Sequence, residues 1–139
     1  MNIAVIDGQG GGIGKAVIAA IRTELGDDIE ILALGTNALA TSAMLKAGAN
    51  EGATGENAIA VNAPKADLII GSVAILAADS MLGELTLPMA AAVARSAAQK
   101  VLIPLNRCGI HVAGVAAKPL PHYIGDIILY IRGVLKEES

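Results

Sequence analysis

Aromatic residues are almost missing from this chain of 139 residues, which has two tyrosines and no phenylalanine or tryptophan. Single-stranded nucleic acids stack their bases on aromatic side chains, so this absence argues against that class of ligand. Basic residues are not in excess either, because the formal net charge is −3. A protein without a basic surface has no electrostatic footprint for DNA, RNA or an anionic membrane. We therefore expect neither a nucleic-acid partner nor a membrane partner.

Cysteine and long apolar runs are also scarce. The single Cys108 cannot form an internal disulfide, which is typical of proteins in a reducing cytoplasm. The longest uncharged apolar run, residues 68–78, is too short to cross a bilayer. The first residues lack the basic segment that opens a signal peptide. These absences predict a cytoplasmic protein, and the length suits a single domain over residues 1–139.

Glycine is abundant by contrast, and five glycines stand within seven residues directly after the apolar run 3–6. An amphipathic helical pattern follows at once. Strand, glycine-rich turn and helix start together form a phosphate-binding unit, because glycines admit a ligand close to the backbone and the helix start favours an anion. The candidate binding residues of this loop are Asp7, Gly8, Gln9, Gly10, Gly11, Gly12, Ile13, Gly14 and Lys15.

The spacing of these glycines is Gly8-x-x-x-Gly12-x-Gly14, which fits neither G-x-G-x-x-G nor a Walker A loop. Over about the first 37 residues the chain resembles the nucleotide loop of short-chain dehydrogenases, with Asp7 where those enzymes usually have Thr or Ser. A bare carboxylate at this place repels a pyrophosphate. Asp7 therefore caps its own loop, pairs with Lys15, or shares a metal ion such as Mg²⁺ with the phosphate. The alternative is a tight turn that binds nothing.

Apolar runs alternate with helical patterns along the rest of the chain. We expect strands at residues 2–7, 29–34, 58–62, 68–75 and 101–105, helices at 12–25, 38–47, 86–98 and within 121–136, and a polar connection at 50–57. Only four residues separate the fifth strand from residues 110–115, which is too few for a parallel crossover, so we predict an antiparallel edge strand there. The pattern predicts an α/β fold: a Rossmann-like doubly wound sheet, mainly parallel, with a C-terminal helix.

Other candidate binding residues follow the second and fifth strands, because open α/β sheets bind ligands beyond the carboxyl ends of their strands. The turn of Gly35, Thr36 and Asn37 either caps the next helix or contacts an adenosine ribose. Asn106 and Arg107 follow the fifth strand, where the arginine either clamps a phosphate or lies in a solvated turn.

The candidate catalytic residues are Asp79 and Glu84, which lie in a connection of ten residues before the helix at residue 86. This connection is longer than a turn needs and could fold over the glycine loop. The two carboxylates then act on a metal or as a general base. The alternative is a helix-start loop in which carboxylates interact favourably with the helix dipole.

The whole chain resembles a family of small bacterial proteins known only as a domain of unknown function. The resemblance is carried by VIDGQGGGIG at residues 5–14, ALGTNALAT at residues 33–41 and SMLGE at residues 80–84, with ATGEN at 53–57 and IPLN at 103–106. It implies a nucleotide-binding-like α/β fold and brings no established activity.

Two function classes follow from these features. One is a protein that binds a nucleotide, NAD(P) included, or another small phosphate-bearing ligand; the other is a small metal-assisted enzyme on a nucleotide or phosphorylated metabolite. A hydride-transferring dehydrogenase ranks lower, because neither tyrosine has a lysine four residues later. A third possibility is an oligomeric scaffold without a ligand. The chain is 54% hydrophobic and its last helix is apolar on two sides, which predicts a homo-oligomer, most simply a dimer.

Overall fold

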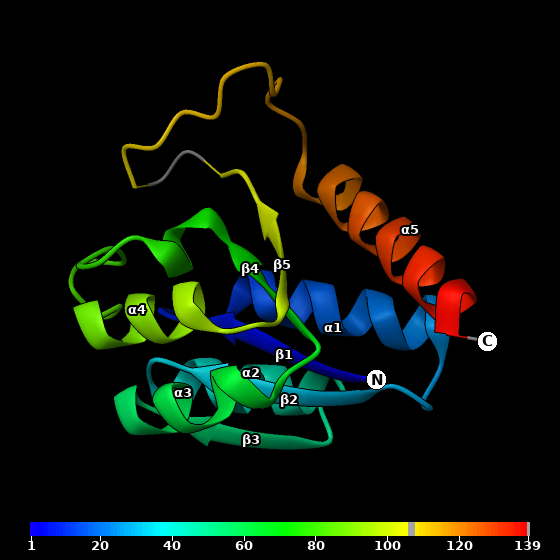
Figure 1. The fold of residues 1–139 in the computed structure, drawn as a ribbon, viewed down its shortest axis with the longest axis horizontal. Coiled ribbons are helices and arrows are strands. Elements are labelled where there is room, and N and C mark those ends of the chain that lie inside the picture. Colours follow the sequence, from blue (N-terminus) through cyan, green and yellow to red (C-terminus); the bar gives the residue numbers. More distant parts are fainter. Residues whose placement is uncertain (106–107, 139) are drawn as a thin grey trace.

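A parallel sheet of five strands forms the centre of the computed structural model, which describes residues 1–105 and 108–138 (Figure 1). The strand order is β3-β2-β1-β4-β5, so β1 is central and pairs with β2 on one side and β4 on the other. The order reverses between β1 and β4, and doubly wound sheets bind ligands at such a switch point. The strands are β1 (Asn2–Asp7), β2 (Glu30–Gly35), β3 (Glu51–Thr54), β4 (Leu68–Ser72) and β5 (Gln99–Ile103).

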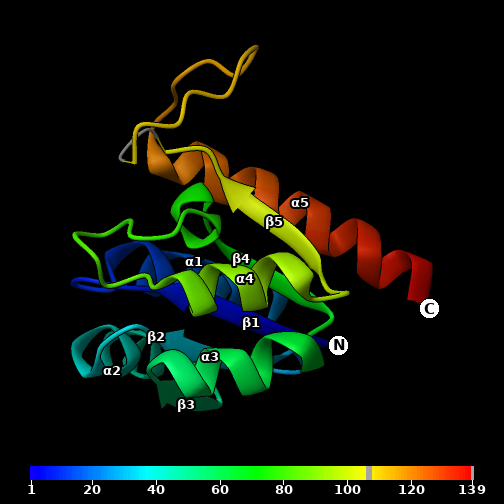
Figure 2. The same ribbon diagram turned by 60° about the vertical axis from the view of Figure 1, so that its left-hand side comes forward.

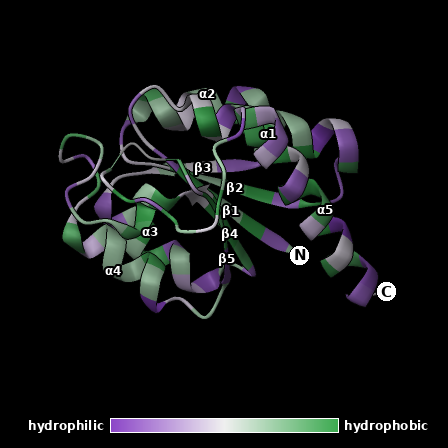
Figure 3. Cartoon of the chain, turned by 90° about the horizontal axis from the view of Figure 1, so that it is seen from above, coloured by the Kyte–Doolittle hydropathy of each residue, from purple (hydrophilic) through white to green (hydrophobic). Residues whose placement is uncertain are grey.

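Helices cover both faces of the sheet, and Figure 3 shows α1 and α2 on the side opposite α3 and α4. Successive residues of β1 supply two cores, because Ile3 and Val5 pack with α1, α2 and α5 while Ala4 and Ile6 pack with α3 and α4. No helix in the described part of the chain is long and apolar enough to cross a membrane. The helices are α1 (Gly12–Leu25), α2 (Ala38–Ala47), α3 (Glu56–Asn62), α4 (Leu87–Arg95) and α5 (Leu120–Glu138). The predicted Rossmann-like α/β fold is confirmed.

The third strand lies earlier in the chain than the sequence predicts. Residues 58–62 belong to α3, and β3 comes from residues 51–54, inside the segment expected to be a connection. A short apolar run fits a helix as well as a strand, and here the helix wins because Gly55, with a φ of 101°, turns the chain directly after β3. Since β3 is an edge strand, it tolerates polar residues such as Glu51.

The predicted antiparallel strand at residues 110–115 is wrong. Residues 110–119 are irregular and belong to a segment between β5 and α5 that extends away from the sheet (Figures 1 and 2). Gly109 and Gly114 have φ values of 74° and 83°, and such left-handed positions interrupt an extended run. The Tyr123 hydroxyl in α5 donates to the Ala116 carbonyl at 3.1 Å, which anchors the end of the segment. The edge strand on this side is therefore the parallel β5.

Several strand boundaries in β2, β4 and β5 also differ from the prediction by one to three residues, and the end of β4 bears on the site. β4 ends at Ser72 and not at residue 75, because the chain continues as the short 3-10 helix η2 (Val73–Leu76). A second 3-10 helix, η1 (Ala63–Lys65), precedes β4, and β5 begins two residues earlier than expected. Ser72 is consequently a strand-end residue at the switch point.

The C-terminal helix α5 buries more of its apolar surface against its own domain than the dimer prediction assumed. Ile127, Ile128 and Ile131 are all buried in the core that α5 shares with α1. Leu129 and Tyr130 stay 65% and 39% exposed. Both apolar lines of the helix thus contact the domain itself, and the dimer stays a prediction that rests on Leu129 and Tyr130.

Candidate functional site

The glycine-rich loop connects the carboxyl end of β1 to the start of α1, as predicted. Its turn is closed by the Gly11 amide, which donates to the Gly8 carbonyl at 2.9 Å. Gly11 is the N-cap residue of α1 and has a φ of 72°, and Gln9 has a φ of 50°. The helix then continues with the Lys15 amide donating to the Gly11 carbonyl. The loop therefore places the positive end of the α1 dipole at the switch point.

Three of the five glycines are required by the fold itself. A Cβ on Gly8 would lie 2.5 Å from Thr36 Oγ1, and one on Gly14 would lie 2.5 Å from a methionine sulfur in α2. A Cβ on Gly11 would lie 2.8 Å from the Ala40 Cα, and the left-handed backbone there also disfavours a side chain. Packing against α2 and the β2–α2 turn thus explains these glycines without any ligand.

Gly10 and Gly12 have no such explanation. A Cβ added at either residue meets no heavy atom within 4 Å, and neither backbone is left-handed. Both residues are exposed. No described group accepts a hydrogen bond from either amide. Gly10 lies in the turn before α1 and Gly12 is the first residue of α1, and neither packing nor backbone conformation requires glycine at these two places. Close approach of a ligand to the backbone is a physical reason for it.

Asp7 caps its own loop. Its side chain is 6% exposed, and its carboxylate accepts hydrogen bonds from the Gly8 amide at 2.8 Å and from the Gly14 amide at 2.7 Å. Burial raises the pKa of Asp7, while the hydrogen bonds from these backbone amides oppose that rise. No ion pair joins Asp7 to Lys15 within the described residues. The sequence left three roles open for Asp7: capping the loop, pairing with Lys15 or sharing a metal ion. The hydrogen bonds of the structure correspond to capping.

Glu84 holds a second side of the loop, although it is 75 residues away from Gln9. Its Oε1 atom accepts from the Gln9 amide at 2.8 Å, from Thr36 Oγ1 at 2.8 Å and from Asn37 Nδ2 at 2.7 Å. These hydrogen bonds, with the Gln9 amide first, lower the pKa of Glu84. The carboxylate therefore joins the connection before α4 to the glycine loop and to the β2–α2 turn.

The β2–α2 turn has two roles in the fold. Asn37 is the N-cap of α2, because its Oδ1 accepts from the Ala40 amide at 2.8 Å. Its Nδ2 also donates to the Gln9 carbonyl at 3.0 Å, so the turn binds the glycine loop directly. Gly35 is required by packing, since a Cβ there would overlap Thr41 Oγ1. The structure thus brings the predicted residues 35–37 against the loop.

The connection between η2 and α4 covers the loop with a strained backbone. Asp79, Met81 and Leu82 have φ values of 67°, 58° and 57°, a region that costs a residue other than glycine about 1–2 kcal/mol. The Asp79 amide donates to the Leu85 carbonyl at 2.7 Å, which closes this connection. Asp79 itself is exposed, and its hydrogen bonds stay within the connection. Strained residues of this kind are concentrated at binding and active sites.

A cavity of about 150 Å³ lies between the glycine loop and this connection, at the carboxyl ends of β1 and β4. Two of its polar groups are nearly inaccessible to solvent: Asp7, and Ser72 with 7% exposure. The sequence prediction missed Ser72 because it extended β4 beyond it. β1 ends at Asp7 and β4 at Ser72, each two residues beyond the pair of Val5 and Ile70, so the strand register points to Ser72 once the end of β4 is known. The lining consists of Asp7, Gly8, Gln9, Ile13, Ser72, Ala74, Met81, Leu82, Leu105 and Cys108.

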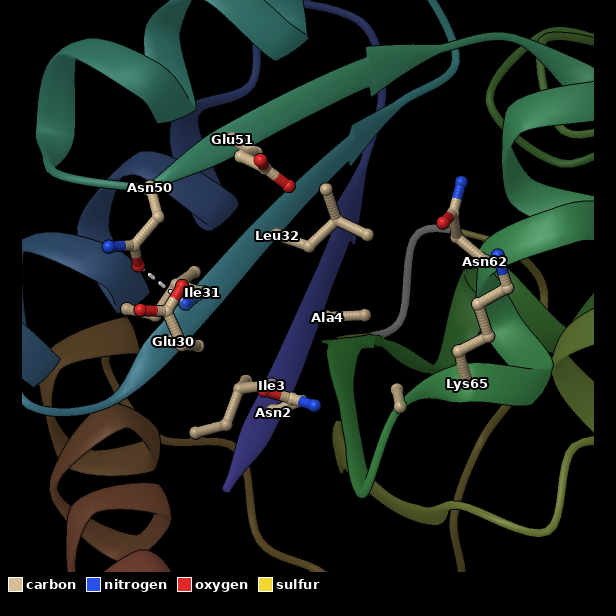
Figure 4. Close-up of a pocket in the computed structure, with 11 residues that line it drawn as sticks. Asn2, Ile3, Ala4, Glu30, Ile31, Leu32, Asn50, Glu51, Asn62 and Lys65 are labelled. Atoms are coloured by element: carbon tan, nitrogen blue, oxygen red, sulfur yellow. Dashed lines mark hydrogen bonds between the residues drawn. The ribbon is translucent and has the colours of Figure 1, made fainter.

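A second hollow, of about 220 Å³, lies at the amino ends of β1, β2 and β3 (Figure 4). Its floor contains Ala4 and Leu32, and Glu51 and Lys65 stand on opposite sides of it. Both charged side chains are exposed. None of the candidate binding or catalytic residues named above lines this hollow.

Two of the predicted residues, Asn106 and Arg107, lie outside the described part of the chain. Within residues 1–105 and 108–138, no group of three His, Cys, Asp or Glu side chains is arranged to hold a metal ion. The site therefore consists of the glycine loop, the Glu84 hydrogen bonds and the cavity beside Asp7 and Ser72.

A doubly wound parallel sheet with a glycine-rich loop at its switch point defines a Rossmann-like α/β fold. The chain belongs to the family described as Domain of unknown function (DUF3842), whose model matches residues 2–136. It matches no curated protein and no solved structure.

Proposed function

We propose that this protein binds a small phosphate-bearing ligand of the nucleotide class at the glycine-rich loop. The observation that carries the proposal is the pair Gly10 and Gly12, whose lack of a side chain serves neither packing nor backbone conformation. Their amides lie at the start of α1, where the helix dipole favours an anion. The phosphate oxygens accept hydrogen bonds from these two amides, on the solvent side of the loop.

The two carboxylates decide the conditions under which the phosphate binds. Asp7 and Glu84 already accept the amides of Gly8, Gln9 and Gly14, and both charges lie near the phosphate position. They disfavour a bare phosphate dianion by Coulomb repulsion. We therefore expect the ligand to bind with Mg²⁺, which the Oε2 atom of Glu84 can contact because the described partners of Glu84 are all on Oε1.

A mononucleotide or a smaller phosphate ester suits the site better than NAD(P). The cavity of about 150 Å³ is smaller than the roughly 300–1,000 Å³ of pockets that enclose drug-sized ligands. β2 also ends in Leu34 and Gly35, where an NAD site usually carries an acidic residue. Glu84 brings a carboxylate to the end of β2 from the connection before α4. Its three hydrogen bonds favour a role in positioning the glycine loop over the catalytic role that the sequence suggested.

Titration calorimetry with inorganic phosphate, AMP, ATP and NAD(P), each with and without Mg²⁺, tests the proposal. Gly12→Ala places a methyl group in the phosphate position without a clash, so it should weaken binding at least about tenfold and leave the melting temperature nearly unchanged. Gly133→Ala in α5 is the matched control, because its Cβ also meets open space. Equal affinity of wild type and Gly12→Ala would contradict the proposal.

We also propose a homodimer through the exposed part of α5. Leu129 and Tyr130 are large apolar residues that the domain leaves exposed on one helix. Light scattering should give a dimer for the wild type and a monomer for Leu129→Glu. Ile128→Glu is not a test of the interface, because Ile128 is buried in the domain and a buried charge there should destabilise the fold itself.

A further inference from the structure

We infer that the cavity between β1 and β4 binds a neutral, hydroxyl-bearing part of the ligand, such as a sugar ring, through Asp7 and Ser72. The inference rests on the proposed function, since the sugar belongs to the phosphate ester at Gly10 and Gly12. The observation behind this inference is that a hydrogen-bond acceptor, Asp7, and a donor, Ser72, lie at the ends of the adjacent strands β1 and β4. The pairing of β1 with β4 ends at Val5 and Ile70, both strands run two residues further, to Asp7 and Ser72, and these two residues line the same cavity.

Ser72 has an unused donor. It is 7% exposed, and its Oγ atom accepts from the Ala74 amide at 3.3 Å, as the N-cap of η2. No described atom accepts the Ser72 hydroxyl proton, although the residue lines the cavity. Its oxygen already has one partner, as do all buried side-chain polar atoms of the described residues, so the hydroxyl proton is free to turn toward the cavity. A ligand oxygen in the cavity would accept this hydrogen bond.

Asp7 has unused acceptor capacity beside it. Its two oxygens accept the Gly8 and Gly14 amides, and the Ile13 amide is close enough to lower the pKa of Asp7 as well, whereas a carboxylate offers about four acceptor sites. Asp7 is 6% exposed and lines the same cavity. A hydroxyl group both donates and accepts, so a hydroxyl or a pair of neighbouring hydroxyls satisfies Asp7 and Ser72 together.

The rest of the lining favours a neutral group over an anion. The Asp7 carboxylate supplies negative charge, and no lysine or arginine is among the described residues that line the cavity. The remaining walls include the side chains of Ile13, Ala74 and Leu105, which pack against C–H groups. The described lining therefore disfavours a phosphate in the interior, while the carbon face and hydroxyl groups of a sugar fit the acceptor, the donor and the apolar walls.

The test compares three probes in the presence of Mg²⁺: methyl phosphate, ribose 5-phosphate and free ribose. We expect ribose 5-phosphate to bind at least about tenfold more tightly than methyl phosphate, because hydrogen bonds to a buried charged group add to the phosphate contacts. Ser72→Ala should remove most of this difference and leave methyl phosphate affinity unchanged. Ser42→Ala, on the partly exposed side of α2, is the matched control and should bind both esters as the wild type does.

The possible failures separate the two proposals. Equal affinity for the two esters, or a Ser72→Ala variant that keeps the full difference, overturns the sugar subsite while the phosphate site stands. If neither ester binds, the phosphate site is wrong, and free ribose decides the cavity. If the wild type binds free ribose and Ser72→Ala does not, the sugar subsite is supported. If the wild type does not bind ribose either, the sugar subsite is overturned together with the phosphate site.

Discussion

The hollow at the amino ends of the strands is larger than the cavity at the carboxyl ends, about 220 Å³ against about 150 Å³. Its charged residues, Glu30, Glu51 and Lys65, are all exposed. The smaller cavity has Asp7 and Ser72 buried to more than nine-tenths beneath a strained connection. Desolvated polar groups and a strained backbone are costly, so their concentration at one end of the sheet indicates the functional end better than volume does.

The largest expected effect is on stability, and it separates the glycines that the fold requires from the glycines that we assign to ligand binding. Gly11→Ala should lower the free energy of unfolding by about 3 kcal/mol. The backbone of residue 11 is left-handed, which disfavours a side chain, and the new Cβ would lie against the Ala40 backbone. Gly10→Ala should change it by less than about 0.5 kcal/mol. Urea unfolding measures both. Similar losses for the two variants would remove the distinction on which the ligand site rests.

The next effect compares a carboxylate at each end of the sheet. Asp7→Ala leaves the buried amides of Gly8 and Gly14 without their acceptor, which should cost about 2 kcal/mol of stability. Glu51→Ala at the amino-end hollow should cost less than about 0.5 kcal/mol, because the side chain is exposed. If Asp7→Ala were as stable as Glu51→Ala, the cap on the glycine loop would not exist in solution.

A smaller effect concerns pH, and the two site carboxylates act in opposite directions. Burial raises the pKa of Asp7 above 3.8, so its contribution to stability is largest below that pH and is lost as the pH rises through the raised value. Hydrogen bonds lower the pKa of Glu84 below 4.5, so its contribution is present above pH 4.5 and is lost as the pH falls through the lowered value.

Melting temperatures of the wild type, Asp7→Asn and Glu84→Gln between about pH 3 and pH 7 check these directions. The advantage of the wild type over Glu84→Gln should disappear at the acid end. The melting temperature of the wild type relative to that of Asp7→Asn should instead fall as the pH rises. Parallel curves for all three proteins would show that neither pKa differs between the folded and unfolded states.

The smallest effect is expected for ligand binding after changes at the amino-end hollow. Glu51→Ala and Lys65→Ala should each keep the phosphate affinity within about twofold of the wild type, because neither residue lines the cavity beside the glycine loop. A loss of about tenfold in either variant would move the ligand site to the other end of the sheet.

Local features of the site could be predicted from the sequence. The glycines, the apolar run before them and Gly26 define β1, the loop and α1, and α1 has the predicted bounds. Asn37 is the N-cap of α2, as its residue type suggests. Each of these features depends on residues within a few positions of one another, so pattern and propensity suffice.

Features that depend on distant residues could not be predicted in the same way. The sequence suggested that the connection before α4 folds over the loop, but not that Glu84, instead of Asp79, would accept from Gln9, Thr36 and Asn37. The position of Ser72 depends on where β4 ends, and the apolar residues that follow it fit a strand and a 3-10 helix equally well. The edge strand β3 is polar enough to resemble a loop.

The most direct test of the phosphate site is a ¹H–¹⁵N spectrum of the protein titrated with AMP and Mg²⁺. The account predicts that the amide resonances of Gly10 and Gly12 shift most, since these amides gain a charged acceptor. The amides of Glu51 and Lys65 at the opposite end of the sheet should stay in place. An absence of shifts in the glycine loop, or larger shifts at the amino-end hollow, would contradict the central claim.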